Sequence, residues 1–318
     1  MTTYILLLVF HLAVLLIAPI FMIGIINRVK SIWSGRRGPK LYQSYFDLIR
    51  LLRKQPVYSN VTSWIFPLAP TIVLGTTIVA GLLSPVVAGF TPFAFPIDFI
   101  LFAYTLALGK LFMMLGALDT GSAFEGMGAS REATYSALAE PVFLLGLGTL
   151  AWASHSSSFQ SLVAPTGVLW LDIALRMSVG LAIFGVLLIE ACRVPADDPT
   201  THLELTMVHE VMILDHSGPE LAFVQYAAAM KLTIFSGIIA SILNPLSLGN
   251  VADASILAVV ASASISVVIM AVIAIIIGMI ESLIARLRFR TLPLYTMAAF
   301  VAVVISLVVV NANRGLFQ

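Results

Sequence analysis

Residues 254–282 read ASILAVVASASISVVIMAVIAIIIGMIES, and the first 27 of these residues include no charged side chain. The hydrocarbon core of a bilayer is about 30 Å thick, so a helix of about 20 apolar residues crosses it with every backbone group bonded internally. This stretch therefore predicts a membrane-spanning helix and indicates an all-α membrane protein.

The composition of the whole chain agrees with that prediction. Of its 318 residues, 60% are apolar and only 10% are charged, and the mean hydropathy is +1.03. A soluble domain is about a quarter charged, so this chain has too few polar side chains to cover a soluble surface. The net charge of +1 argues against a nucleic-acid partner, because such partners require a basic surplus.

Two further features limit the function. Cys192 is the only cysteine, which excludes an internal disulfide and an iron–sulfur cluster held by this chain alone. The N-terminal apolar stretch is long and has no basic segment before it, so we expect a retained span rather than a cleaved signal.

Seven other stretches are long and apolar enough to be read as membrane-spanning helices. We therefore predict a polytopic protein with eight transmembrane helices in a single membrane domain over residues 1–318. A short amphipathic helix is expected at residues 40–54. The predicted spans are 3–27, 64–89, 97–118, 133–154, 168–192, 219–243, 254–282 and 291–311.

The basic residues are distributed unequally between the two sides of such a bundle. Thirteen of the 17 Lys and Arg residues lie in connections on one side, at 28–63, 119–132, 193–218 and 283–290. The opposite connections hold none; these are residues 90–96, 155–167 and 244–253. Positive charge marks the cytoplasmic side, so we predict that the basic connections face the cytoplasm and that both termini lie outside.

The first basic connection carries the amphipathic helix. Leu41, Tyr45, Leu48, Ile49 and Leu52 recur at helical spacing, and basic residues fall on the other side. The helix is expected to anchor the chain at the lipid headgroups, to dock a peripheral partner, or both. The candidate docking residues here are Arg36, Arg37, Asp47 and Arg50.

Ionisable residues inside the spans point to function, because a charge at that depth must face protein or water. Lys110, Glu140, Glu190 and Lys231 are expected to form one polar chain between helices that moves protons. The alternative for Glu140 is a structural hydrogen bond between helices. Asp172 and Arg176 are spaced as a structural i,i+4 ion pair, and Glu281 is expected to pair with an arginine of the 283–290 connection.

The third basic connection concentrates titratable residues in DDPTTHLELTMVHEVMILDHSGPE (197–220). Residues 203–214 predict a short helix packed on the other connections. Two of its histidines are seven residues apart, roughly 10 Å along a helix, which is too far for one metal ion. We predict no metal site and interpret His202, His209 and His216 as partner-facing. The acids, expected in the proton path, are Asp119, Asp197, Asp198, Glu204, Glu210 and Asp215.

The sequence shows no nucleophile with an adjacent base, no phosphate-binding loop and no dinucleotide fingerprint, so a self-contained enzyme is not expected. Two classes remain. A secondary transporter would have a midplane cavity and often repeat symmetry, and no internal repeat is visible. A membrane scaffold that docks a redox module and conducts protons matches the elaborate basic connections better.

Three motifs carry a specific resemblance. LDTGSAFEGMGASREATYSALAEP (118–141), RRGPKLYQSYFDLIRLL (36–52) and ESLIARLR (281–288) closely resemble the membrane subunits of formate hydrogenlyase and hydrogenase-4 complexes. These proteins are homologues of the eight-helix subunit of respiratory complex I that joins its two arms. The resemblance covers essentially the whole chain.

The resemblance implies a non-catalytic subunit in a prokaryotic cell membrane that itself binds no cofactor. Its implied partners are an iron–sulfur small subunit and a large subunit with a nickel–iron centre on the cytoplasmic face, antiporter-like membrane subunits, and membrane lipid. The alternative is a quinone oxidoreductase subunit that contributes to a quinone chamber. By motif position, Arg131, Glu140, Glu190 and Asp197 match family residues.

The sequence departs from the family pattern in the third connection. Where the family has Pro-Phe-Asp, this chain has Pro195-Ala196-Asp197, and its Asp215-His216-Ser217-Gly218 replaces Glu-Tyr-Ser-Gly. In the quinone-using branch this region borders the quinone chamber. The divergence of this region therefore leaves the identity of the electron acceptor open.

Overall fold

The computed structural model describes residues 2–163, 169–197, 208–247, 255–284, 287 and 291–316. Within these ranges the chain forms helices and no strand, which confirms the predicted fold class. Among the described residues, eight helices are long and apolar enough to cross a membrane. They are α1 (Thr2–Trp33), α3 (Ile65–Leu83), α4 (Asp98–Asp119), α5 (Ala123–Ser154), α7 (Leu169–Glu190), α9 (Gly218–Leu243), α10 (Ile256–Leu283) and α11 (Leu292–Leu316).

Three shorter helices lie in the connections, namely α2 (Gln43–Leu52), α6 (Phe159–Leu162) and α8 (His209–Met212). Every residue of α2 is at least partly exposed, as an interfacial helix would be. Its position at the lipid surface stays a prediction.

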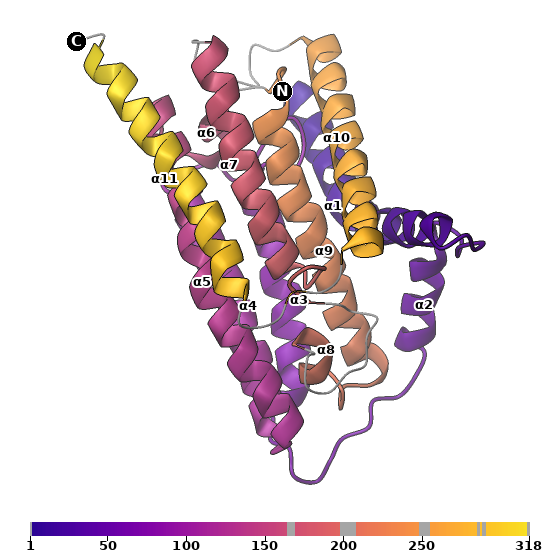
Figure 1. The fold of residues 1–318 in the computed structure, drawn as a ribbon. Coiled ribbons are helices and arrows are strands. Elements are labelled where there is room, and N and C mark those ends of the chain that lie inside the picture. Colours follow the sequence, from indigo (N-terminus) through magenta and orange to yellow (C-terminus); the bar gives the residue numbers. More distant parts are fainter. Residues whose placement is uncertain are drawn as a thin grey trace.

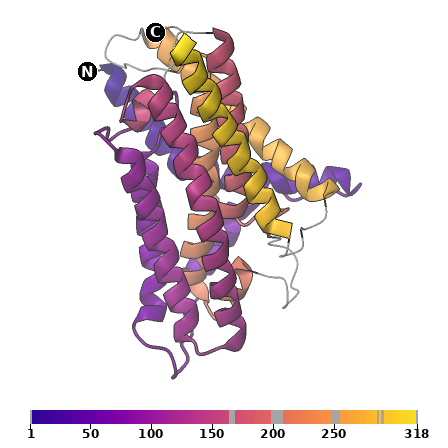
Figure 2. The same cartoon turned by 60° about the vertical axis from the view of Figure 1, so that its left-hand side comes forward.

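The eight long helices form one bundle, and the N-terminus of α1 lies on the same side as the C-terminus of α11 (Figures 1 and 2). We refer to this side as the termini end and to the opposite side as the cavity end. The helix α9 is central and contacts α1, α3, α7 and α10. The helix α1 crosses the bundle obliquely, and its last turns lie against the end of α10. A common side for both termini agrees with an even number of spans; which side faces the cytoplasm stays a prediction.

Several predicted boundaries were wrong. The helix α1 continues to Trp33, beyond the predicted end at 27, and α3 ends at Leu83, before the predicted end at 89. The helix α5 begins at Ala123, ten residues before the predicted start at 133, so Arg131 lies within a helix rather than in a loop. In the third connection only His209–Met212 is helical among the described residues of the predicted 203–214 helix. Its first part lies outside the described residues, with Asp198, His202, Glu204 and the arginines at 286, 288 and 290.

A turn of irregular backbone is buried within the bundle near the termini end. Val86, Val87 and Ala88 are fully buried, and their backbone polar groups need partners because water cannot reach them. The hydroxyls of Ser241 and Ser266 meet this need by bonding the backbone of residues 85–89. The turn closes the space between α3, α9 and α10 at this end.

Candidate functional site

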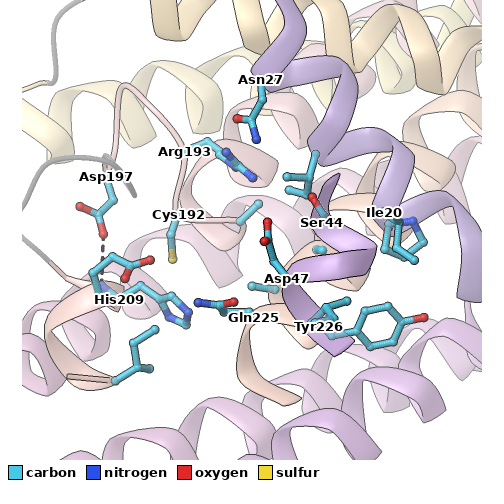
Figure 3. Close-up of a pocket in the computed structure, with 18 residues that line it drawn as sticks. Ile20, Asn27, Ser44, Asp47, Cys192, Arg193, Asp197, His209, Gln225 and Tyr226 are labelled. Atoms are coloured by element: carbon cyan, nitrogen blue, oxygen red, sulfur yellow. Dashed lines mark hydrogen bonds between the residues drawn. The ribbon is translucent and has the colours of Figure 1, made fainter. Parts of the chain in front are cut away.

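A cavity of about 360 Å³ opens at the cavity end between α1, α2, the segment after α7, α8 and α9 (Figure 3). One part of its wall is apolar and is formed by Pro19, Ile20, Ile23, Leu48, Ala228 and Ala229. The other part is polar and is formed by Asn27, Ser44, Asp47, Cys192, Arg193, Asp197, His209, Glu210, Gln225 and Tyr226. Four predicted site residues thus meet here: Asp47, Asp197, His209 and Glu210.

Asp197 holds α8 against the cavity. Its Oδ2 accepts hydrogen bonds from the backbone N–H groups of Val208 at 3.2 Å and His209 at 3.1 Å. A carboxylate at a helix start satisfies amides that have no partner within the helix. The match of Asp197 to a family aspartate therefore coincides with a visible structural role.

His209 is the histidine that lines the cavity. Burial, followed by the positive charge of Lys231, lowers the pKa of His209 to about 4. The ring is thus neutral at physiological pH and can act as a hydrogen-bond donor or acceptor. His209 thus lies in the cavity wall, and its contact with a partner protein stays a prediction.

Cys192 borders the same cavity. Burial raises the pKa of its thiol well above the usual value, and the negative charges of Glu132 and Asp197 add to the effect. The thiol is therefore protonated and unreactive as a nucleophile.

Arg193 lines the cavity and also takes part in an ion-pair triad. Its guanidinium lies 3.3 Å from Glu281 at the end of α10, and Lys30 of α1 lies 2.9 Å from the same carboxylate. The structure pairs this fully buried side chain with cations of α1 and of the segment after α7, whereas the arginines of the 283–290 connection that were predicted to pair with it lie outside the described residues. The triad ties together the ends of three spanning helices.

A second group of charges lies inside the bundle. Lys110 of α4 pairs directly with Glu190 at the end of α7, and both side chains are at least 94% buried. The same ammonium group lies 3.8 Å from Glu140 and donates to the hydroxyl of Ser136 at 3.1 Å, both on α5. Three of the four residues predicted to form a polar chain therefore make direct contact. We call Lys110, Ser136, Glu140 and Glu190 the charge cluster.

A cavity of about 20 Å³ adjoins the charge cluster. Such a volume holds a single water, which needs polar partners. The Oε2 atom of Glu190 is a buried oxygen that makes no hydrogen bond to the described part of the chain. The geometry therefore suits one water that links the carboxylates.

Glu132 and Lys231 interact electrostatically with members of both the charge cluster and the wall of the large cavity. Glu132 interacts electrostatically with Lys110, Glu190, Lys231 and Asp197, and Lys231 also acts on His209. Lys231 is thus close to both groups, as the predicted polar chain requires. Sequence reasoning missed Glu132, although it precedes Ser136 and Glu140 on the same helix by about one and two turns, which was a usable signal.

His216 lies elsewhere and is not exposed. Its ring is 3% exposed, stacks on Phe66 with centroids 4.0 Å apart, and has Nδ1 3.3 Å from Glu220. Burial lowers the pKa of His216, and Glu220 opposes this effect. Glu220 also accepts a 2.5 Å hydrogen bond from Tyr58, which raises the pKa of Tyr58 to about 12. The expected partner-facing position of His216 is therefore wrong.

The remaining predicted residues are scattered. Asp119 accepts a 2.7 Å hydrogen bond from the Ser63 backbone, and exposed Asp215 donates its own N–H to Glu125 at 3.2 Å. These acids join neither the cavity nor the charge cluster. Arg36, Arg37 and Arg50 are exposed, as docking residues would be, and Arg131 is half-buried on α5.

Within the described ranges, no group of three or more His, Cys, Asp or Glu side chains is arranged to hold a metal ion. Cys192 and the acids of the cavity are instead spread over its wall (Figure 3).

Comparison with known proteins places these features in a family. The family model described as NADH dehydrogenase matches residues 5–312. The chain is 28% identical to hydrogenase-4 component C of Escherichia coli over 290 residues, covering 90% of this chain and 89% of the relative. It is also 28% identical to formate hydrogenlyase subunit 4 of Escherichia coli over 287 residues, covering 89% and 91%.

A solved structure shares the fold. A chain of the membrane-bound sulfane sulfur reductase, an archaeal respiratory membrane complex, superposes with a TM-score of 0.75 at 17% identity, covering 97% of this chain and 98% of the other. Since the family match spans nearly all of the sequence and the helices agree with a multi-pass membrane protein, the chain belongs to the NADH dehydrogenase family.

Proposed function

We propose that this chain is the membrane-anchoring and proton-translocating subunit of a complex-I-like, membrane-bound nickel–iron hydrogenase. It docks a hydrophilic redox module, with an iron–sulfur small subunit and a large catalytic subunit, and joins it to antiporter-like membrane subunits. The names of the two Escherichia coli relatives, a hydrogenase component and a formate hydrogenlyase subunit, support the hydrogenase assignment.

The observation that carries the proposal is the run of titratable groups from the large cavity into the bundle. It passes from Asp197 and His209 through Lys231 and Glu132 to the charge cluster. Protons move between such groups and bridging waters. Charges at this depth cost free energy, so their presence indicates a function. A change of charge in a docked redox module acts on the acids of the cavity first and on the charge cluster next.

The exposure of Glu140 is an argument for a neighbouring subunit inside the membrane. Its side chain is 44% exposed although it lies well within the spanning helix α5. A carboxylate is expensive in lipid, so this face of the bundle requires protein or water against it. An antiporter-like membrane subunit meets that requirement.

The docking role is supported at the cavity end. Exposed Arg36 and Arg37 precede α2, and exposed Arg50 lies on it. The same helix contributes Ser44, Asp47 and Leu48 to the cavity wall. A redox module bound on this surface would cover the cavity mouth. Its iron–sulfur and nickel–iron centres would remain in the partner chains.

The central test is Glu140→Gln in the whole complex reconstituted in vesicles. We expect electron transfer and assembly to persist while turnover-coupled proton movement, followed with a pH-sensitive dye, is lost. Glu125→Gln is the matched control, because it makes the same change about 22 Å away along α5, outside the charge cluster. Normal proton movement in Glu140→Gln would remove this residue from the path.

Purification tests the docking role. Affinity isolation of this chain in mild detergent should recover an iron–sulfur subunit and a large subunit in fixed ratio. Recovery as a lone, stable protein that transports a solute would instead support a secondary transporter.

The second candidate is a subunit of a quinone oxidoreductase, and the large cavity favours it. An apolar wall from α1 and α9 suits a quinone tail, and Arg193 and His209 offer hydrogen bonds to a ring carbonyl. Photolabelling with an azido-quinone distinguishes the two. Labelled peptides from residues 19–27 and 225–229 would support the quinone branch, and their absence in an active hydrogen-evolving complex would exclude it.

A further inference from the structure

Four phenylalanine rings form a compact cluster on one side of the charge cluster. Phe102 of α4 lies 5.7 Å from Phe143 of α5, 5.6 Å from Phe159 of α6 and 6.1 Å from Phe235 of α9, measured between ring centroids. Phe143 and Phe235 are 5.4 Å apart. All four side chains are buried, with at most 4% exposed. These rings come from four different elements and meet at one point.

The rings lie between the charge cluster and the termini end. Phe143 and Phe235 line the small cavity beside Lys110, Glu140 and Glu190. Phe102 precedes Lys110 by eight residues, so it lies about 12 Å closer to the termini end along α4. Phe159 continues the stack beyond the spanning helices. A proton that leaves the charge cluster toward the termini end thus meets these rings first.

Polar groups resume on the far side of the rings. Asp98, at the start of α4, is fully buried and accepts the backbone N–H of Phe159 at 2.6 Å. Asp172 and Arg176 form a buried pair at 2.8 Å, and Arg176 also donates to two backbone carbonyls. The rings therefore separate two polar regions. Asp98 holds one of the rings, Phe159, in place through its backbone.

We propose that Phe102, Phe143, Phe159 and Phe235 form an insulating barrier that prevents protons from passing between the charge cluster and the termini end through this chain. The inference rests on the proposed proton-translocating function. The rings offer no group that can carry a proton, and a space lined by aromatic side chains excludes water. Protons in the charge cluster must leave by another face, and the exposed side of Glu140 is available.

The barrier has a specific physical requirement. An apolar cavity stays dry even when it is large, whereas a cavity with polar partners takes up water. Replacing a ring by alanine should therefore open the barrier less than replacing it by serine. The hydroxyl supplies the polar partner that a chain of waters needs next to the charge cluster.

The test measures passive proton flow through the whole complex in vesicles without electron donor. A potassium diffusion potential drives protons inward, and an enclosed pH-sensitive dye reports their entry. Phe102→Ser, Phe235→Ser and their combination should conduct protons several-fold faster than the unmodified complex. Phe235→Ala should conduct less than Phe235→Ser, and Phe235→Leu should remain tight.

Phe90→Ser is the matched control. Phe90 is 1% exposed and packs against Tyr4 and His11 in another part of the bundle. Proton entry at the unmodified rate in the barrier variants, or equal leakage in Phe90→Ser, would overturn the proposal. If the variants within the spans do not assemble, Phe159→Ser is measured with the same two outcomes, because it changes a ring outside them.

This test is independent of turnover. Loss of the proposed function would appear as normal coupled proton movement in Glu140→Gln, whereas loss of the barrier proposal appears as an unchanged passive leak. Each result can occur without the other.

Discussion

Lys110 on α4 and Glu190 at the end of α7 form an ion pair inside the bundle, with side chains that are 6% and 5% exposed. The two residues are 80 positions apart in the sequence. Both charges lie far from water, so each depends on the other. The pair is the centre of the charge cluster.

Removing one charge of this pair should lower the free energy of unfolding more than removing both. Lys110→Met or Glu190→Gln alone leaves one charge of the pair buried without the other, which costs about 3–5 kcal/mol, whereas the double variant removes both charges of the pair. Denaturation of the isolated subunit in detergent measures this as a double-mutant cycle. Additive effects of the two changes would show that the ion pair does not stabilise the fold.

Glu281 should stabilise the protein far more than Asp47 does. Glu281 has no exposed side-chain area and holds two cations, so Glu281→Gln should cost about 3–5 kcal/mol and loosen α1 from α10. Asp47 lies 3.8 Å from Arg50 with both side chains largely exposed, so Asp47→Asn should cost less than about 1 kcal/mol. Thermal unfolding in detergent compares the two. Equal losses of stability in the two variants would mean that burial does not determine how much these ion pairs stabilise the fold.

His209 should make stability depend on pH. Its pKa of about 4 in the folded protein is below the ordinary histidine value of 6.5, so the unfolded chain binds more protons between these values. The folded state should therefore lose stability as pH falls from 6.5 toward 4. The His209→Gln variant should lose less over this range. An identical pH slope in both proteins, measured by thermal unfolding, would show that His209 is not buried in the neutral form.

Gly237 should tolerate no side chain. A Cβ there would lie 2.8 Å from the backbone of Val86 in the buried turn, so Gly237→Ala should cost about 1–3 kcal/mol. Gly148→Ala on α5 is the control, because nothing lies within 4 Å of its Cβ and alanine favours a helix by up to about 1 kcal/mol. Thermal midpoints of the two variants should shift in opposite directions. A neutral Gly237→Ala would show that the turn is not packed against α9.

Much of the fold could be predicted because each span carries its own signal. Length and hydropathy locate a helix in lipid without knowledge of its neighbours, and all eight spans were found in this way. The Asp172–Arg176 pair was also predicted and is confirmed at 2.8 Å, since it depends only on the geometry of one helix. Predictions that rest on local spacing succeeded.

The start of α5 shows where local signals fail. Small and polar residues in GSAFEGMGASRE resemble a loop, yet Ala123 begins a helix whose glycines allow close packing against α8. Gly128 has Val211 and Met212 within 3 Å of where a Cβ would lie. Tertiary contact therefore extends the helix past the apolar stretch.

The site was predicted in part for the same reason. Intramembrane charge identified Lys110, Glu140 and Glu190, whereas the cavity wall was mostly missed. Asn27 and Gln225 are polar residues in apolar spans and were a usable signal for it. Arg193 and Cys192 had no such signal, because only the turn after α7 directs them to the cavity.

The sequence by itself determined eight helices that are long and apolar enough to cross a membrane, as the described residues have them, and a few charges within these helices. It could do so because the cost of a charge or an open backbone in lipid is the same for every helix. Only the tertiary structure decided which charges meet, which histidine lines the cavity and which is buried on Phe66, and where four phenylalanines converge. Those outcomes depend on the packing of helices that are distant in sequence, and no local pattern specifies it.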